Sequence, residues 1–105
     1  MSYYAKVDGT IKFKSPITQQ YNQLEAELLE TFDSVYESGN YQVINLYGNI
    51  KYDKDSIFEL LSTISDNYEI VEAEIEYIGE DTALWRHIYI DGKWKEQYGE
   101  IKYKD

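Results

Sequence analysis

The stretch ALWRHIYI-DG-KWKEQYGEIKY, residues 83–103, decides the fold because it carries the strongest turn signal of the chain. Asp91-Gly92 favours a two-residue type I′ turn, since both residues tolerate a positive φ. Apolar and aromatic runs flank this dipeptide, which predicts a β-hairpin with strands over 83–90 and 94–103. Gly99 is predicted to form a bulge in the second strand. The C-terminal third of the chain is therefore expected to belong to an antiparallel sheet.

Two earlier segments alternate between apolar and polar residues, which is typical of half-buried strands. Residues 69–78 alternate in this way and are followed by a turn at 79–82. Residues 3–14 alternate as well, and Asp8-Gly9 within them permits either a tight hairpin or a bulge in one long strand. We expect one strand, because the alternation continues in phase through the glycine.

Between these strands the apolar spacing changes to that of a helix. Ser15-Pro16 is predicted to begin a helix over 16–33, as N-cap and first helical residue. A second helix is predicted near 54–65, capped by Asp53 or Asp55. The side chains expected to face the core are Ile17, Tyr21, Leu24, Leu28 and Phe32 in the first helix and Ile57, Leu60, Leu61 and Ile64 in the second. Residues 41–51 are rich in β-formers and predict a central strand with a bulge at Gly48.

The predicted order is β-α-β-α-β-β-β, which indicates an α+β fold: a mainly antiparallel sheet with two helices on one face. At 105 residues the chain is expected to form a single domain, residues 1–105. No stretch approaches the length of a membrane span, and the N-terminus lacks a signal-peptide pattern, so we expect a cytoplasmic protein that does not contact a membrane. Without cysteine there is no thiolate metal site, and the six glycines are isolated, so no metal or other cofactor is expected.

Negative charge is concentrated in the middle of the chain. The net charge is −10, and residues 53–81 hold ten carboxylates against Lys54 alone, a local balance of −9. Such a field repels nucleic acid and attracts basic surfaces. We therefore expect no direct binding of nucleic acid.

The predicted strand over 69–78 gives part of this charge a regular geometry. Successive glutamates on one side of it lie about 6.6–6.8 Å apart, close to the spacing of charges along a phosphate backbone. No cation stands nearby in the sequence to offset them. The residues expected to bind a basic partner are Glu69, Glu72, Glu74, Glu76, Glu80 and Asp81. The alternative interpretation is a solvated face that only keeps the protein soluble.

The sequence contains no recognisable catalytic motif, so we do not expect an enzyme. His87 is the only histidine, on the same strand face as Trp85 and Tyr89, and we expect it to be structural. Asp53 and Asp55 lack the glycine and the closing glutamate of a calcium loop. We expect the twelve tyrosines to pack on the faces of the sheet and not to stack on nucleic-acid bases, because base stacking needs a basic surface beside the aromatic rings.

The segments Leu84-Trp85-Arg86, Asp91-Gly92-Lys93-Trp94 with Glu96, and Gly99-Glu100-Ile101-Lys102-Tyr103 are similar to the closing strands of small ferredoxin-like orphan proteins of phages, plasmids and bacteria. The opening residues 3–11, followed by Ser15-Pro16-Ile17, are similar as well. The resemblance covers about half of the chain and implies a ferredoxin-like α+β sandwich that originates from a mobile element. It implies no catalytic residue. The predicted element order departs from βαββαβ, and residues 34–42 could hold a further short strand.

Two hypotheses follow from these patterns. The first is a phage-type inhibitor, acidic and non-enzymatic, that occupies the basic channel of a host nucleic-acid-processing defence enzyme, of the anti-CRISPR or anti-restriction class. The second is a ferredoxin-like module that binds a ligand or forms a homo-oligomer and buries the region of Trp85, Tyr89 and Trp94.

Overall fold

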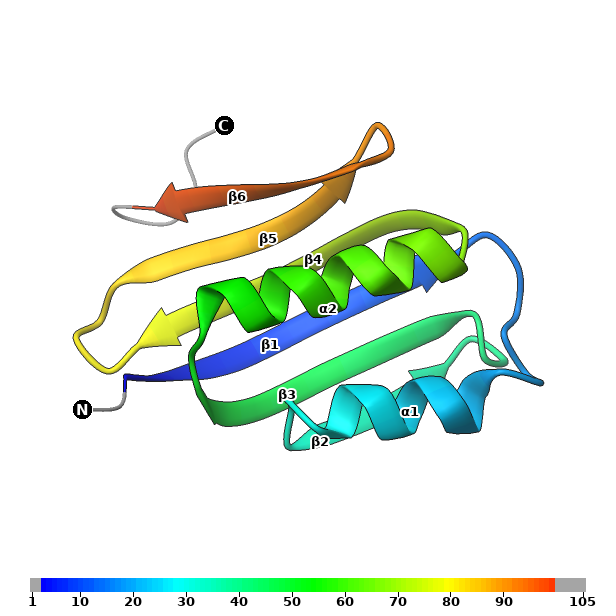
Figure 1. Cartoon of the computed structure of the whole chain (residues 1–105), viewed down its shortest axis with the longest axis horizontal. Helices are drawn as coiled ribbons and strands as arrows, with labels where there is room; N and C mark the ends of the chain where they lie inside the picture. The colour runs from blue at the N-terminus through cyan, green and yellow to red at the C-terminus, as the bar shows by residue number, and fades with distance from the viewer. Residues whose placement is uncertain (1–2, 100–105) are drawn as a thin grey trace.

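The computed structural model of the chain describes residues 3–99, which form one six-stranded antiparallel sheet and two helices (Figure 1). In chain order the elements are β1 (Tyr4–Phe13), α1 (Tyr21–Leu29), β2 (Ser34–Ser38), β3 (Val43–Lys51), α2 (Lys54–Asn67), β4 (Ile70–Gly79), β5 (Leu84–Ile90) and β6 (Lys93–Gly99). The strands lie side by side in the order β2-β3-β1-β4-β5-β6. The predicted α+β class with an antiparallel sheet is confirmed.

β1 is one continuous strand, as predicted, and it pairs with β3 on one side and β4 on the other. Its residues alternate strictly between exposed and buried, so one face of the sheet is open and the other is covered. Gly9 causes neither a hairpin nor a bulge. A Cβ atom at this position would lie 2.9 Å from the side chain of Ile75 on β4, so glycine allows the two strands to approach closely.

The hairpin predicted around Asp91-Gly92 is present. Both turn residues have positive φ, 53° and 78°, as a type I′ turn requires. The pairing continues without a shift from Ile90 and Lys93 to Leu84 and Gly99. The strand predicted for residues 100–103 lies outside the described residues.

The predicted start of the first helix is wrong. α1 begins at Tyr21, with Gln20 as an N-cap that makes no side-chain capping hydrogen bond. Ser15-Pro16 instead belongs to the connection between β1 and α1. The backbone N–H of Ile17 donates to the carbonyl oxygen of Tyr41, 2.9 Å away, and the buried Ile17 side chain anchors this connection to the core.

The predicted end of the first helix at residue 33 is also too late, and residues 34–38 form the further short strand that the sequence left open within 34–42. α1 ends at Leu29, and β2 pairs with β3 over its full length. The Asp33 carboxylate accepts a hydrogen bond from the backbone N–H of Asn49, 2.9 Å away, at the point where β2 begins. The pairing of β3 with β1 is continuous, so the bulge predicted at Gly48 is absent.

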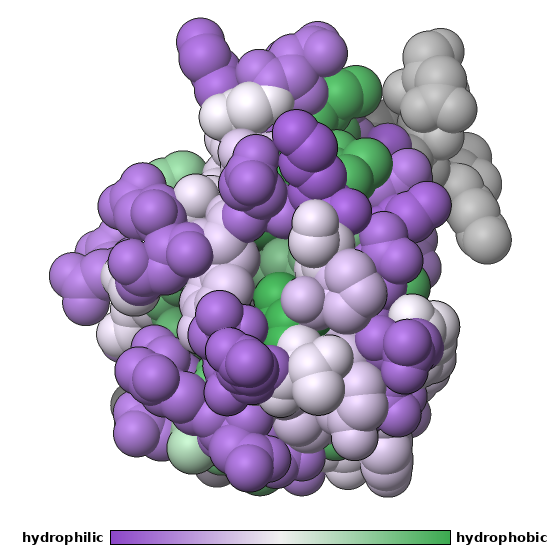
Figure 2. All heavy atoms as spheres, turned by 90° about the vertical axis from the view of Figure 1, so that its right-hand side faces the viewer, coloured by the Kyte–Doolittle hydropathy of each residue, from purple (hydrophilic) through white to green (hydrophobic). Residues whose placement is uncertain are grey.

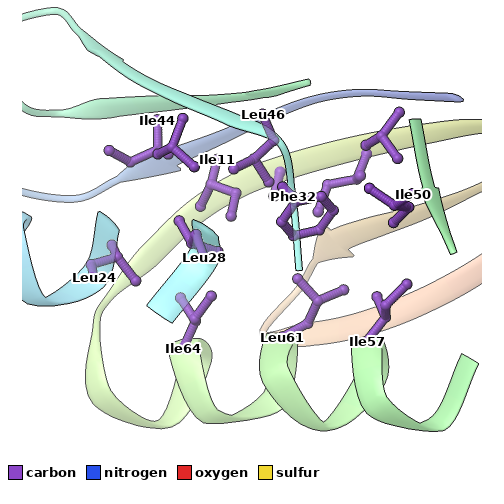
Figure 3. Packing of buried hydrophobic residues seen from close by; sticks show 14 of the residues in the cluster. Ile11, Leu24, Leu28, Phe32, Ile44, Leu46, Ile50, Ile57, Leu61 and Ile64 are labelled. Carbon is purple, nitrogen blue, oxygen red and sulfur yellow. The ribbon is translucent and has the colours of Figure 1, made fainter. Parts of the chain in front are cut away.

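α2 follows its prediction closely. The side chain of Asp53 caps the helix by accepting from the backbone N–H and the hydroxyl of Ser56, at 3.3 and 3.1 Å. Ile57, Leu61 and Ile64 are buried, and Figure 3 shows them pointing from α2 toward the side chains of α1 and the sheet. Together with the buried side chains of α1 and the strands they form one apolar cluster.

The sheet therefore has two different faces. In Figure 1 both helices lie on the viewer's side of the sheet. Figure 3 shows the buried side chains of Ile11 and Leu46 pointing from the strands toward those of the two helices. The opposite side, which we call the open face, carries the exposed residues of the strands. An end-on view shows mostly hydrophilic residues surrounding a smaller apolar area (Figure 2).

Candidate functional site

The glutamate row predicted on residues 69–78 is present on the open face. Glu72, Glu74 and Glu76 alternate along β4 with Ala73, Ile75 and Tyr77, which are buried on the helix side. The three carboxylates therefore point to the same side of one strand. This part of the predicted binding site has the expected geometry.

The expectation that no cation offsets this row is wrong. Arg86 of β5 forms an ion pair with Glu74, and its Nε donates to Oε1 of Gln97 at 2.7 Å. Lys12 of β1 stands directly opposite Glu72 in the strand register. These cations are far from the glutamates in sequence, and only the pairing of β1, β4 and β5 brings them together.

The other predicted acids lie at the two ends of β4. Glu69 precedes the strand and pairs with Lys14 at 3.7 Å, with both side chains largely exposed, so this pair contributes little to stability. Glu80 and Asp81 follow the strand in the turn to β5, and Asp81 accepts hydrogen bonds from the Tyr3 hydroxyl and the Ala83 backbone N–H. The hydrogen bond from Tyr3 is the main cause of the lowered pKa of Asp81. Ten strand residues, on the order of 30 Å, separate these two ends, so the six acids do not form one patch.

The open face as a whole is not acidic. Residues that are paired across the strands share a side of the sheet, and on this basis the open face holds six cations and four carboxylates within the described strands. The cations are Lys6, Lys12, Lys51, Arg86, Lys93 and Lys95, and the carboxylates are Asp8, Glu72, Glu74 and Glu76. This arrangement gives the open face a small positive balance.

The helix side carries the negative charge instead. The two helices and their cap residues hold seven carboxylates against Lys54 alone. We call these residues the helical acid layer: Glu25, Glu27, Glu30, Asp53, Asp55, Glu59 and Asp66. The layer is not apparent from the sequence, because Glu25, Glu27 and Glu30 are distant from the acidic block at 53–81.

His87 is fully buried on the helix side of β5, next to Trp85 as predicted. Its Nδ1 lies 2.9 Å from the Tyr77 hydroxyl, and its Nε2 lies 3.4 Å from Oε2 of Glu96. Burial lowers the pKa of His87, and the nearby Glu96 carboxylate opposes this shift. The histidine is therefore held mainly neutral inside the protein, in agreement with a structural role.

Glu96 connects this buried histidine to the surface. Its carboxylate accepts hydrogen bonds from the hydroxyls of Tyr98 and Tyr52, at 2.9 and 3.4 Å, and pairs with Lys54 at 3.2 Å. Burial opposes the charge, but the Tyr98 hydrogen bond and the Lys54 ammonium outweigh it and lower the pKa of Glu96. Sequence reasoning missed Lys54 of α2 and Tyr52, which lies between β3 and the α2 N-cap, because both are far from Glu96 in the sequence.

Two of the hollows on these surfaces adjoin the charged residues described above. One, of about 650 Å³, is on the open face and is bordered by Lys12, Glu72, Glu74 and Arg86, whose charges largely offset one another. The other, of about 450 Å³, lies between the N-terminal half of α2 and β6. Residues 3–99 contain no group of three or more histidine or carboxylate side chains placed to hold a metal ion.

Comparisons with protein-family models, with curated proteins and with solved structures gave no match. Over residues 3–99, neither helix has the length and apolar character needed to cross a membrane.

Proposed function

We propose that this chain is a small acidic binding protein without enzymatic activity, and that its partner is the basic surface of a nucleic-acid-binding protein. The observation that carries the proposal is the charge separation between the two sides of the sheet. Seven carboxylates and one lysine occupy the helices and their caps, whereas the open face has a small positive balance. A one-sided negative field steers a protein toward a positive surface and orients it on arrival.

The partner class that we propose is a host nucleic-acid-processing defence enzyme, such as a CRISPR effector or a restriction nuclease, with the chain as a phage-type inhibitor. The channels of such enzymes bind phosphates through lysine and arginine side chains. A surface rich in carboxylates competes with nucleic acid for these cations. We assign the main contact to the helical acid layer, and a secondary contact to Glu72, Glu74 and Glu76.

The arrangement of the elements supports the proposed relation to ferredoxin-like proteins. β1, α1, β2, β3, α2 and β4 follow the order βαββαβ, and the four strands lie in the order β2-β3-β1-β4, all antiparallel. We infer a ferredoxin-like core, with both helices on one face, to which the β5–β6 hairpin is added at the β4 edge. The fold by itself assigns no function.

A homo-oligomerising module is the second candidate function, because large apolar side chains are exposed on the open face. Tyr36 and Tyr47 lie in contact there, with ring centroids 5.9 Å apart, and each is more than 40% exposed. Tyr4, Ile78 and Ile90 are exposed on the same face. A second copy of the chain would cover them, which sedimentation at several concentrations would detect.

Two triple variants with equal charge change test the main proposal. The helical variant combines Glu27→Gln, Glu30→Gln and Asp66→Asn, and the sheet variant combines Glu72→Gln, Glu74→Gln and Glu76→Gln. The assay is inhibition of purified CRISPR effectors and restriction nucleases, with competing DNA and a series of salt concentrations. We expect the wild type to inhibit at least one enzyme of the panel, and we expect added salt and DNA to weaken this inhibition. The inhibition should fall tenfold or more in the helical variant and by a smaller factor in the sheet variant. Absence of inhibition across the panel, or inhibition that DNA does not oppose, would contradict the proposal.

A further inference from the structure

The hollow between α2 and β6 is an aromatic-walled pocket within the acidic side of the molecule. Its volume is about 450 Å³, which lies in the range of pockets that bind small ligands. Four lining residues come from α2 and two from β6: Lys54, Asp55, Phe58, Glu59, Trp94 and Glu96. We call it the α2–β6 pocket.

The two aromatic walls of the pocket differ in how they are held. The Trp94 indole is fixed, because its Nε1 donates to the carbonyl oxygen of Leu61 at 2.9 Å and its ring packs on Tyr89, with centroids 5.2 Å apart. Phe58 is 41% exposed, and its ring lies tilted against the His87 imidazole, with ring centroids 6.1 Å apart. One wall is therefore rigid, while the other presents apolar surface to an incoming group.

The carboxylates of the pocket are only partly neutralised. Glu96, with a side chain 15% exposed, is paired with Lys54, which is 61% exposed at the rim. Asp55 and Glu59 are exposed, and neither forms an ion pair within the described part of the chain. Three carboxylates against one lysine leave a negative balance beside two aromatic rings.

We propose that the α2–β6 pocket receives an arginine side chain of a basic partner protein. This inference rests on the proposed function and specifies how the partner is anchored. A guanidinium group is planar and weakly hydrated, stacks on aromatic rings and binds carboxylates through two parallel hydrogen bonds. The pocket offers all of these contacts: the rings of Trp94 and Phe58, and the carboxylates of Asp55 and Glu59. Anions are repelled, and a neutral apolar group leaves the two carboxylates without a partner.

Three short peptides probe this preference directly. They are Gly-Arg-Gly, Gly-Lys-Gly and Gly-citrulline-Gly, each acetylated and amidated, titrated into the ¹⁵N-labelled full chain. Citrulline keeps the shape of arginine but lacks its charge. We expect saturable shifts of the Trp94 indole N–H and the Phe58 amide with the arginine peptide, weaker binding of the lysine peptide and no binding of the citrulline peptide. Equal shifts with arginine and lysine, or shifts spread over the acidic surface without a maximum at the pocket, would overturn the proposal.

Two substitutions locate the binding within the pocket. Phe58→Ala removes an exposed ring, and Glu59→Gln removes a carboxylate, so neither disturbs the buried core. Each substitution is expected to lower the affinity for the arginine peptide by about two- to fivefold. Glu27→Gln on α1 is the matched control, with the same charge change away from the pocket, and is expected to have little effect. An unchanged affinity in Phe58→Ala contradicts the proposal.

The same variants separate this inference from the proposed function. If the helical triple variant loses inhibition but Phe58→Ala keeps both inhibition and arginine binding, the acidic surface binds its partner without the pocket, and the inference fails alone. If the pocket prefers arginine over lysine but no nuclease is inhibited, the inference stands and the proposed partner class fails.

Discussion

His87 Nε2 lies 3.4 Å from Oε2 of Glu96, and the imidazole is fully buried while the carboxylate reaches the surface. The Tyr77 hydroxyl contacts the other ring nitrogen at 2.9 Å. Protonation of His87 would place a charge where burial disfavours it, although Glu96 partly compensates. Burial of His87 therefore makes the stability of the protein depend on pH, and the contact with Glu96 weakens that dependence.

Stability should decrease when the pH falls below about 6.5, the ordinary pKa of histidine. Burial lowers the pKa of His87 in the folded state, so in this range the unfolded chain binds more protons than the folded one. The free energy of unfolding is then fully retained above 6.5 and declines as the pH falls toward the folded-state pKa. Urea unfolding between pH 7.5 and 5 measures this slope. Glu96 and Asp81, with lowered pKa values, add losses only below about 4.5, outside this window.

The variant His87→Gln should lose most of that slope. It should also be less stable than the wild type at pH 7.5, by about 1–3 kcal/mol, because the buried Tyr77 hydroxyl loses its partner. If His87→Gln keeps the full slope between pH 7.5 and 5, another group is responsible and the buried position of His87 does not control the pH dependence.

Replacing Glu96 by glutamine should lower the pKa of His87 further. The carboxylate is the interaction that raises the histidine pKa against burial, and glutamine removes its charge. His87 is the only histidine of the chain, so its imidazole proton gives a single NMR titration curve without assignment problems. Glu72→Gln, on the open face, is the matched control and should leave the curve unchanged. A higher His87 pKa in Glu96→Gln would contradict the prediction.

Leu28 and Leu29 are adjacent on α1 and test whether that helix packs as described. Leu28 is fully buried, whereas Leu29 is 46% exposed. Leu28→Ala should lower the free energy of unfolding by about 2–5 kcal/mol, because it leaves a cavity in the core. Leu29→Ala should change it by about 0.5 kcal/mol or less. Similar losses in both variants, measured by urea unfolding, would mean that α1 is rotated or not docked.

The elements that the sequence predicted well are those in which local signals and tertiary packing agree. α2 has a cap at Asp53 and an apolar stripe, and the Asp91-Gly92 turn determines the pairing of β5 with β6. α1 lacks such a cap. Ser15-Pro16 predicted a helix start, but the backbone N–H of Ile17 donates to the Tyr41 carbonyl oxygen and holds this segment in the connection before α1. β2, only five residues long, is stabilised by pairing with β3 more than by its own composition.

The candidate site was less predictable because charge compensation depends on strand register. Arg86 is twelve residues from Glu74 in sequence, and the helix-borne acids of α1 and α2 come from separate segments. The role of Gly9 also depends on strand pairing. The sequence showed that the alternation of residues 3–14 continues through this glycine, but only the pairing of β1 with β4 shows that Ile75 leaves no room for a side chain there.

The open face is not expected to bind nucleic acid. This face has six cations and three exposed tyrosines, Tyr4, Tyr36 and Tyr47, which are features of surfaces that stack and bind single strands. However, four carboxylates are interspersed among the cations, and the whole chain carries a net charge of −10. We expect no micromolar binding of single- or double-stranded DNA or RNA at physiological salt in an anisotropy titration, because too few counterions are released.

The sheet variant with Glu72→Gln, Glu74→Gln and Glu76→Gln should bind nucleic acid better than the wild type. The helical variant should gain less affinity, because its substitutions lie away from the open face. A micromolar, salt-sensitive complex of the wild type would show that the local charge of the open face outweighs the net charge of the chain.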